Sequence, residues 1–229
     1  FASTVGISMC SYRVIHRLHH NDLFGETDPD TPLHGGYPRG RMYLVKRLGR
    51  DLAGLTAYKT YSYFFGAPAL NVDSEAPRRP LDDTAPGLRL AAQADRRGVI
   101  ITQLVMLSIA VLSGYGIEYV LLWIVPALTF LQALLRIRAL MEHGALLDVS
   151  SPLTAARTNL GQRWLMWLVF PHHVNYHIEH HLYPAIPHYN LPAAHAALRD
   201  LGVLSEAEVS NIPRSLRAVF APRRVSVAA

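Results

Sequence analysis

The fold is decided by two apolar runs, VIITQLVMLSIAVLSGYG at residues 99–116 and YVLLWIVPALTFLQALL at residues 119–135. Between Arg97 and Arg136 the one charged residue is Glu118. As helix this stretch would extend roughly 57 Å at about 1.5 Å per residue, close to two crossings of a ~30 Å hydrocarbon core. Gly114, Tyr115 and Gly116 separate the two runs, and the small, flexible glycines there allow the chain to reverse. The sequence therefore predicts two transmembrane helices that form a hairpin.

A buried helical pair in a soluble protein is the alternative, and it is less favoured because neither run has the polar face of a globular helix. The flanking charges predict the orientation. Arg96 and Arg97 precede the hairpin, Arg136 and Arg138 follow it, and neither run contains Lys or Arg. By the positive-inside rule, both ends of the hairpin are expected on the cytoplasmic side.

Composition fits one membrane domain spanning residues 1–229. Half of the 229 residues are apolar and 17% are charged, which argues against intrinsic disorder. The net charge is +5, but the arginines do not gather into a stripe, so no nucleic-acid partner is expected. Cys10 is the single cysteine, which excludes an internal disulfide and a thiolate metal cluster. Any metal must therefore be held by nitrogen or oxygen ligands.

Other parts of the chain are expected to surround this hairpin. The apolar residues 1–15 are interpreted as the cytoplasmic end of an earlier spanning helix, and the Pro-rich residues 72–97 as an exposed loop. The run from Trp164 to Phe170 is too short to span, so it is expected at the membrane interface or inside the protein. One or two short helices are expected after Pro192.

Twelve histidines are present, and the spacing H-x-x-H-H occurs twice. The six residues of these clusters are His16, His19, His20, His177, His180 and His181. Offsets of three and four place the imidazoles of each cluster on one face of a helix. A lone histidine is usually a hydrogen-bonded core or surface residue, but two copies of one spacing make coincidence a poor explanation. Imidazole binds iron, zinc or copper through a neutral ring nitrogen, so the pattern predicts a metal site.

Topology is consistent with one joint site. One complete hairpin separates residue 20 from residue 177, so both clusters are expected on the same side of the membrane. A non-enzymatic membrane metal or haem protein would also suit paired histidines. Against haem, bis-histidine ligation needs two axial histidines rather than two triplets.

The chain resembles the integral-membrane fatty acid desaturase superfamily, whose members carry three histidine boxes. His16 to His20 with the following Asp28-Pro29-Asp30 is similar to the second box, and NYHIEHHLYP at 175–184 resembles the third. PHYNLP at 187–192 is also similar to the family. The resemblance implies an all-α integral-membrane helical bundle with a cytoplasmic histidine-rich cap. It also implies two non-haem iron ions, a lipid or fatty acyl substrate and a separate electron-donor protein.

The resemblance also extends the set of expected ligands. His143 lies after the second run, where the family often supplies an extra ligand; the alternative is a histidine that only supports the site. The first histidine box is absent, so the chain is expected to be truncated before it and to be inactive alone. Glu179 could orient a ligand histidine, although a solvated or salt-bridged glutamate is the commoner outcome. The other histidines are not expected to bind the metal. His172, His188 and His195 are expected to be structural or interfacial, His34 to lie in a loop, and His173 to fall where the family does not normally place a ligand.

The expected activity is O2-dependent desaturation of a fatty acyl chain at a histidine-ligated di-iron centre. Hydroxylation of a lipid or related alkyl substrate is the alternative, because the same superfamily and ligand set also insert oxygen. The histidines alone do not separate these two reactions.

Overall fold

The computed structural model describes residues 2–65 and 85–222, and these residues form mostly helices. The chain divides into two compact units. Of the described residues, the first unit contains 2–30, 48–65 and 85–133, and the second contains 31–47 and 134–222. The expected helical fold is confirmed, with one addition: two three-residue strands pair in parallel in the second unit.

The first unit begins with the 3-10 turn η1 (Ala2–Val5), followed by α1 (Met9–Asn21). The expectation of one helix through residues 1–15 is wrong, because Gly6 has φ +80° and Ser8 caps a new helix by accepting a hydrogen bond from Ser11 N. Asp95 reinforces this helix start by accepting hydrogen bonds from Ser8 Oγ at 2.7 Å and Cys10 N at 2.9 Å.

Asp95 belongs to α5 (Pro86–Leu112), the helix on which α1 packs. Residues 86–97 are therefore helical, and the expected loop over 72–97 is wrong for this part; residues 66–84 lie outside the described chain. The unit also contains α4 (Ala57–Phe64) and the end of α3 (Arg41–Leu52), a helix that begins in the second unit.

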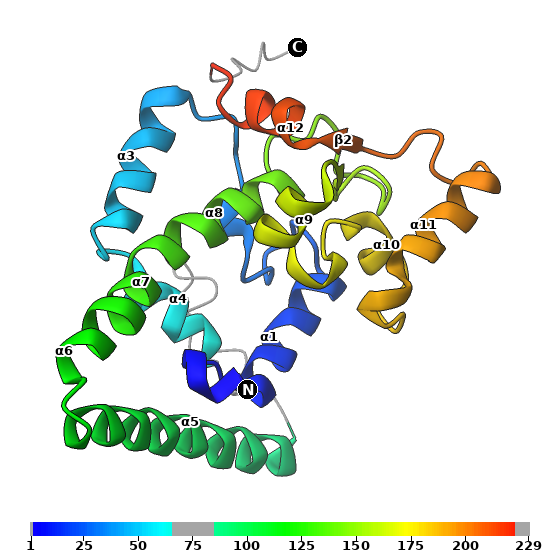
Figure 1. Ribbon diagram of the computed structural model, residues 1–229. Helices are drawn as coiled ribbons and strands as arrows, with labels where there is room; N and C mark the ends of the chain where they lie inside the picture. The colour runs from blue at the N-terminus through cyan, green and yellow to red at the C-terminus, as the bar shows by residue number, and fades with distance from the viewer. Residues whose placement is uncertain (1, 66–84, 223–229) are drawn as a thin grey trace. The chain divides into compact units, whose positions relative to one another are not determined.

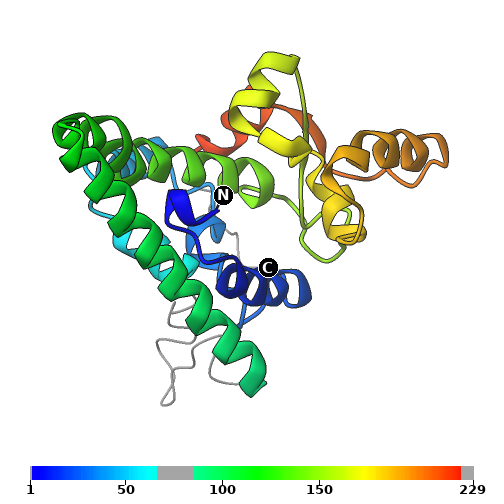
Figure 2. The same ribbon diagram turned by 60° about the horizontal axis from the view of Figure 1, so that its bottom comes forward.

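The first predicted span ends at Leu112, four residues before its expected end, because Gly114 has φ +82° and turns the chain. After this turn come α6 (Gly116–Tyr119), the π-helical turn η2 (Val120–Ile124) and α7 (Val125–Leu128). Figures 1 and 2 show α5 and the α6–α7 helix diverging from the turn instead of lying alongside each other.

The second predicted span lies within a longer helical segment, Gly116–His143, that includes α8 (Phe130–His143). Among the described residues, this is the one helix long and apolar enough to cross a membrane by length and composition. The segment is irregular around Pro126, where two side chains satisfy backbone carbonyls. Thr129 Oγ1 donates to Val125 O, and Gln132 Nε2 donates to Ala127 O, each at 2.7 Å. Such bonds suit an environment without water.

The second unit arranges short elements around the end of α8. In chain order they are α2 (Thr31–His34), β1 (Thr158–Leu160), α9 (Arg163–Val169), η3 (Pro171–His173), α10 (His177–Leu182), η4 (His188–Asn190), α11 (Leu191–Asp200), β2 (Val209–Asn211) and α12 (Ile212–Val219). The two helices α11 and α12 confirm the short helices expected after Pro192.

Within its described residues, the second unit is held together by two small cores. Ile178 of α10 packs with Ala156, Leu198 and Leu204. Met141 of α8 packs with Phe170 and Ile212, so α9 and α12 both attach to the end of α8. Because α8 ends at His143 and α10 begins at His177, these cores fix the backbones that carry the histidines.

Candidate metal centre

In the first unit, α1 carries His16, His19 and His20 on neighbouring positions of one face, as the spacing predicts. Nε2 of His16 and Nε2 of His20 are 3.1 Å apart, and the centroids of the two rings are 4.6 Å apart. The ring centroid of His19 is 5.8 Å from that of His16 and 5.9 Å from that of His20. The offset of four therefore brings two ring nitrogens together, while His19 is held by another contact.

That contact is with Asp28, the acidic residue that follows the cluster. Nδ1 of His19 lies 2.8 Å from Oδ1 of Asp28, and both residues are buried. Asp28 also accepts hydrogen bonds from Phe24 N and Asp30 N, each at 2.9 Å. Burial acts to raise the pKa of Asp28, but the hydrogen bond with His19 and the backbone N–H donors outweigh it and lower the pKa. The carboxylate keeps a proton on Nδ1 of His19, which makes Nε2 the nitrogen suited to a metal.

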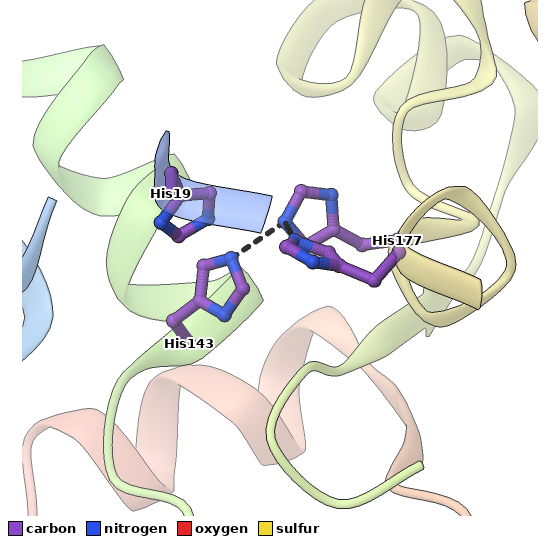
Figure 3. A group of neighbouring side chains, drawn as sticks. His19, His143 and His177 are labelled. Carbon is purple, nitrogen blue, oxygen red and sulfur yellow. Dashed lines mark hydrogen bonds between the residues drawn. The ribbon is translucent and has the colours of Figure 1, made fainter. Parts of the chain in front are cut away.

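In the second unit, three imidazoles converge from α8 and α10. Nε2 of His177 lies 2.7 Å from Nε2 of His143 and 3.2 Å from Nε2 of His181. Figure 3 shows the rings of His143 and His177 pointing toward each other, with this contact dashed. The candidate ligand atoms of all three residues lie within 4.8 Å of one another. The expected helical face of the second cluster is therefore joined by His143.

Hydrogen bonding and charge favour lone pairs on the converging nitrogens. Nδ1 of His143 lies 3.0 Å from the carbonyl oxygen of Ala155, an acceptor that requires the proton on Nδ1. A carboxylate oxygen of Glu142 is 3.9 Å from Nδ1 of His177 and favours the proton there. Burial, followed by the neighbouring imidazole of His143, holds the pKa of His177 well below its ordinary value. Neutral rings whose Nε2 lone pairs face one another repel, and a cation between them removes this repulsion.

The back of α10 is anchored by a buried polar chain. Glu179 is fully buried, and its carboxylate accepts a hydrogen bond from Thr158 Oγ1 at 2.6 Å and contacts Nδ1 of His195 at 2.5 Å. Thr158 Oγ1 in turn accepts from Ile178 N at 3.2 Å. Of the two roles that the sequence allows for Glu179, the structure shows the paired glutamate: its carboxylate ties α10 to β1 and α11 and contacts no ligand ring of the second cluster. His195 is structural, as expected, through this contact.

His34 is a residue that sequence reasoning underestimated. The sequence predicts a loop at this position, but His34 ends the short helix α2 and is buried, with its ring centroid 5.0 Å from that of His143. No spacing signal could have found it, because α2 reaches α8 only through tertiary packing. His172 and His188 pack on each other, with ring centroids 4.9 Å apart, and both are exposed.

The structure thus brings the predicted residues into two groups. His16, His19 and His20 lie together in the first unit, and His143, His177, His180 and His181 lie together in the second, with the ring centroid of His180 5.8 Å from those of His177 and His181. Each group is made of nitrogen donors of the kind that bind iron or zinc. Each is compatible with a metal centre.

Comparison with known proteins agrees with this geometry. The family model described as fatty acid desaturase matches residues 1–210, a range that contains every histidine of the two groups. No curated protein matches the chain significantly, and no solved structure does. The match and the apolar helix Gly116–His143 together indicate an oxidoreductase associated with a membrane and acting on a lipid or acyl substrate. The family model covers well over half of the sequence, and the chain belongs to the fatty acid desaturase family.

Proposed function

We propose that this protein is an O2-dependent fatty acyl desaturase in which the two histidine groups together hold two non-haem iron ions. The observation that carries the proposal is the convergence of three Nε2 atoms, from His143, His177 and His181, in a protein of this family. Nitrogens in adjacent positions around one metal are about 3 Å apart at a metal–nitrogen distance of about 2.1 Å. The separations of 2.7 and 3.2 Å fit that spacing.

The proposed ligands are His16, His19, His20, His143, His177, His180 and His181. The second unit supplies the last four, and the first unit supplies the others through α1. The Nε2 separation of 3.1 Å between His16 and His20 also fits two adjacent positions around one metal. Neither group alone offers enough nitrogens to fill two coordination spheres, so the proposal requires both.

The same distances argue against haem. Two axial nitrogens on opposite sides of one iron are about 4 Å apart at a metal–nitrogen distance of about 2 Å. The 2.7 Å between the Nε2 atoms of His143 and His177 leaves no room for a porphyrin plane between these rings. The rival function as a haem carrier is therefore not favoured at this site.

Two irons held by these histidines would catalyse the four-electron reduction of O2. Two electrons and two protons come from adjacent methylenes of the acyl chain, two electrons come from a separate electron-donor protein, and two protons come from solvent. The products are one alkene and two water molecules. The chain's own residues hold protons away from the metal: Asp28 acts on Nδ1 of His19, and the Ala155 carbonyl acts on Nδ1 of His143. Each ring can then present Nε2 to the metal.

We also propose that the two apolar runs, residues 99–116 and 119–135, cross the membrane, with the histidine groups on the cytoplasmic side. The support is that arginines flank the two apolar runs on both sides and that neither run contains an arginine. On this topology an acyl chain approaches the irons from the bilayer, and the electron donor approaches from the cytoplasm.

The test is product analysis with the full-length protein, a reductant system and a deuterated acyl substrate. Loss of two hydrogens from adjacent carbons, read by mass spectrometry, supports desaturation. Gain of one oxygen atom in the product would instead identify the reaction as hydroxylation. Absence of any oxidised product in a preparation that contains iron, O2 and a working electron donor would contradict both reactions.

A further inference from the structure

Helix α9 (Arg163–Val169) has two apolar faces that differ in exposure. Its inward face packs into the core around Met141 and Phe170 and consists of Leu165, Met166 and Val169. Its outward face has the spacing i, i+3, i+4 and consists of Trp164, Trp167 and Leu168, which are 64%, 77% and 55% exposed. Two exposed tryptophans beside an exposed leucine form an apolar patch of the kind that marks an interaction site.

The depth of α9 in the membrane follows from its packing against α8. Its inward face shares a core with Ile137 and Met141 of α8. The apolar run ends at Leu135, so these residues lie about 3 and 9 Å farther along the helix at about 1.5 Å per residue. The headgroup layer begins where the hydrocarbon core ends and is roughly 5–8 Å thick. With the run through Leu135 in the bilayer, α9 is level with the headgroups on the cytoplasmic side.

We infer that α9 lies in the membrane interface, with Trp164, Trp167 and Leu168 inserted between lipid headgroups and upper acyl chains. This inference rests on the proposed function, specifically on the assignment of residues 119–135 as a span. Tryptophan favours this layer because its ring is apolar while its N–H is polar. Arg163, at the start of α9, is exposed and carries a charge suited to lipid phosphates.

The consequence for the site concerns His143. This residue ends α8, the helix to which α9 is fixed. Anchoring α9 in the headgroups therefore sets the height of His143 above the bilayer from which the acyl chain comes.

Native tryptophans provide the test. The sequence has three: Trp123, Trp164 and Trp167. Trp123 is about 18 Å before Leu135 along a helix, close to the centre of a ~30 Å core, so it reports on the span alone. Three single-tryptophan chains, each with the other two changed to Phe, are reconstituted in phosphatidylcholine vesicles. Nitroxide lipids labelled near the headgroup or near the end of the acyl chain then measure depth, and aqueous iodide measures exposure to water.

The expected result is strong quenching of Trp164 and Trp167 by the shallow nitroxide, weak quenching by iodide, and strong quenching of Trp123 by the deep nitroxide. Quenching of Trp164 and Trp167 by iodide alone, with Trp123 still quenched by the deep nitroxide, would overturn this inference and leave the span intact. Protection of both from iodide and from lipid would also overturn it, in favour of a protein partner. Failure of Trp123 to respond to either lipid would instead refute the span in the proposed function.

A second measurement avoids replacing Trp123, whose Nε1 donates to Thr4 O at 3.1 Å. The chain with Trp164→Phe and Trp167→Phe is compared with the parent chain, and the difference in quenching isolates α9. The same shallow quenching is expected in this difference signal. Its absence would overturn the inference even if the Trp123→Phe chains fail to fold.

Discussion

Replacing Glu179 with Leu tests whether the buried anchor of α10 positions the metal ligands. Leucine accepts no hydrogen bond, so the Thr158 hydroxyl and the His195 ring both lose their buried carboxylate partner. A hydrogen bond to a charged group contributes about 1.5–3 kcal/mol, so the loss in unfolding free energy is about 3–6 kcal/mol for two. The His195 side chain is 11% exposed, and partial access to water places the loss near the lower end of this range.

The effect on the metal is expected to exceed that of destabilisation alone. Groups that hydrogen-bond a ligand ring typically change metal affinity by about 10–100-fold when mutated. Glu179 holds the backbone of α10 and not a ligand ring, so a loss of about 10-fold, the lower end of that range, is expected. Glu179→Gln keeps the shape and can bond both partners, so it is expected to restore most of the affinity. Iron affinity is measured by competition with a chelator, and stability by thermal unfolding in detergent.

Ser215→Ala is the matched control. Ser215 Oγ donates to Asn159 Oδ1 at 2.6 Å in the same unit, and its removal leaves a buried acceptor unsatisfied at a cost of about 1–3 kcal/mol. Iron affinity is expected to be unchanged in this variant. If Glu179→Leu lowers stability without lowering iron affinity, or if Ser215→Ala lowers iron affinity equally, the positioning argument is refuted.

Three further predictions concern other residues. His180→Ala in the full-length protein is expected to abolish turnover and leave membrane insertion intact. The control His188→Ala, at an exposed histidine, is expected to retain activity. Normal activity and iron content in the His180→Ala variant would show that His180 is not a metal ligand. Asp28→Asn is expected to lower iron affinity by about 10–100-fold through loss of the carboxylate on His19, and chelator competition that shows no change would contradict this. Burial raises the pKa of Tyr63 well above its ordinary value of 10, so the unfolded chain loses this proton first as pH rises. The unfolding free energy should then fall by about 1.4 kcal/mol per pH unit above about pH 10, and a Tyr63→Phe variant with the same slope in denaturant titrations would show that this residue is not responsible.

The spacing of histidines in the sequence predicts which imidazoles lie close together within one helix, and no more of the site than that. The offset of four in H-x-x-H-H brings Nε2 atoms to 3.1 Å between His16 and His20 and to 3.2 Å between His177 and His181. A helix fixes such pairs whatever surrounds it. His143 needed the family resemblance, because its approach to His177 is a tertiary contact between α8 and α10.

Contacts between side chains of different helices could not be predicted from the sequence, because they depend on tertiary packing. The pairing of Glu179 with His195 requires α11 to fold back on α10, and the burial of His34 requires α2 to reach α8. The sequence also did not predict where the first apolar helix ends. An apolar pattern continues through residue 116, but the positive φ of Gly114 ends the helix near Leu112, and hydropathy carries no information on backbone angles.

We propose that histidines of both units together hold two irons. X-ray absorption at the iron edge, with iron quantified per chain in the full-length protein, tests it most directly. We expect two irons per chain, a first shell of nitrogen and oxygen at about 2.1 Å, and the outer-shell scattering of several imidazoles. Changing His19 in the first unit or His177 in the second to Ala should each reduce that imidazole scattering and the iron content. A porphyrin signature, a sulfur shell, or iron content that does not respond to one of the two changes would show that the two histidine groups do not jointly hold a di-iron centre.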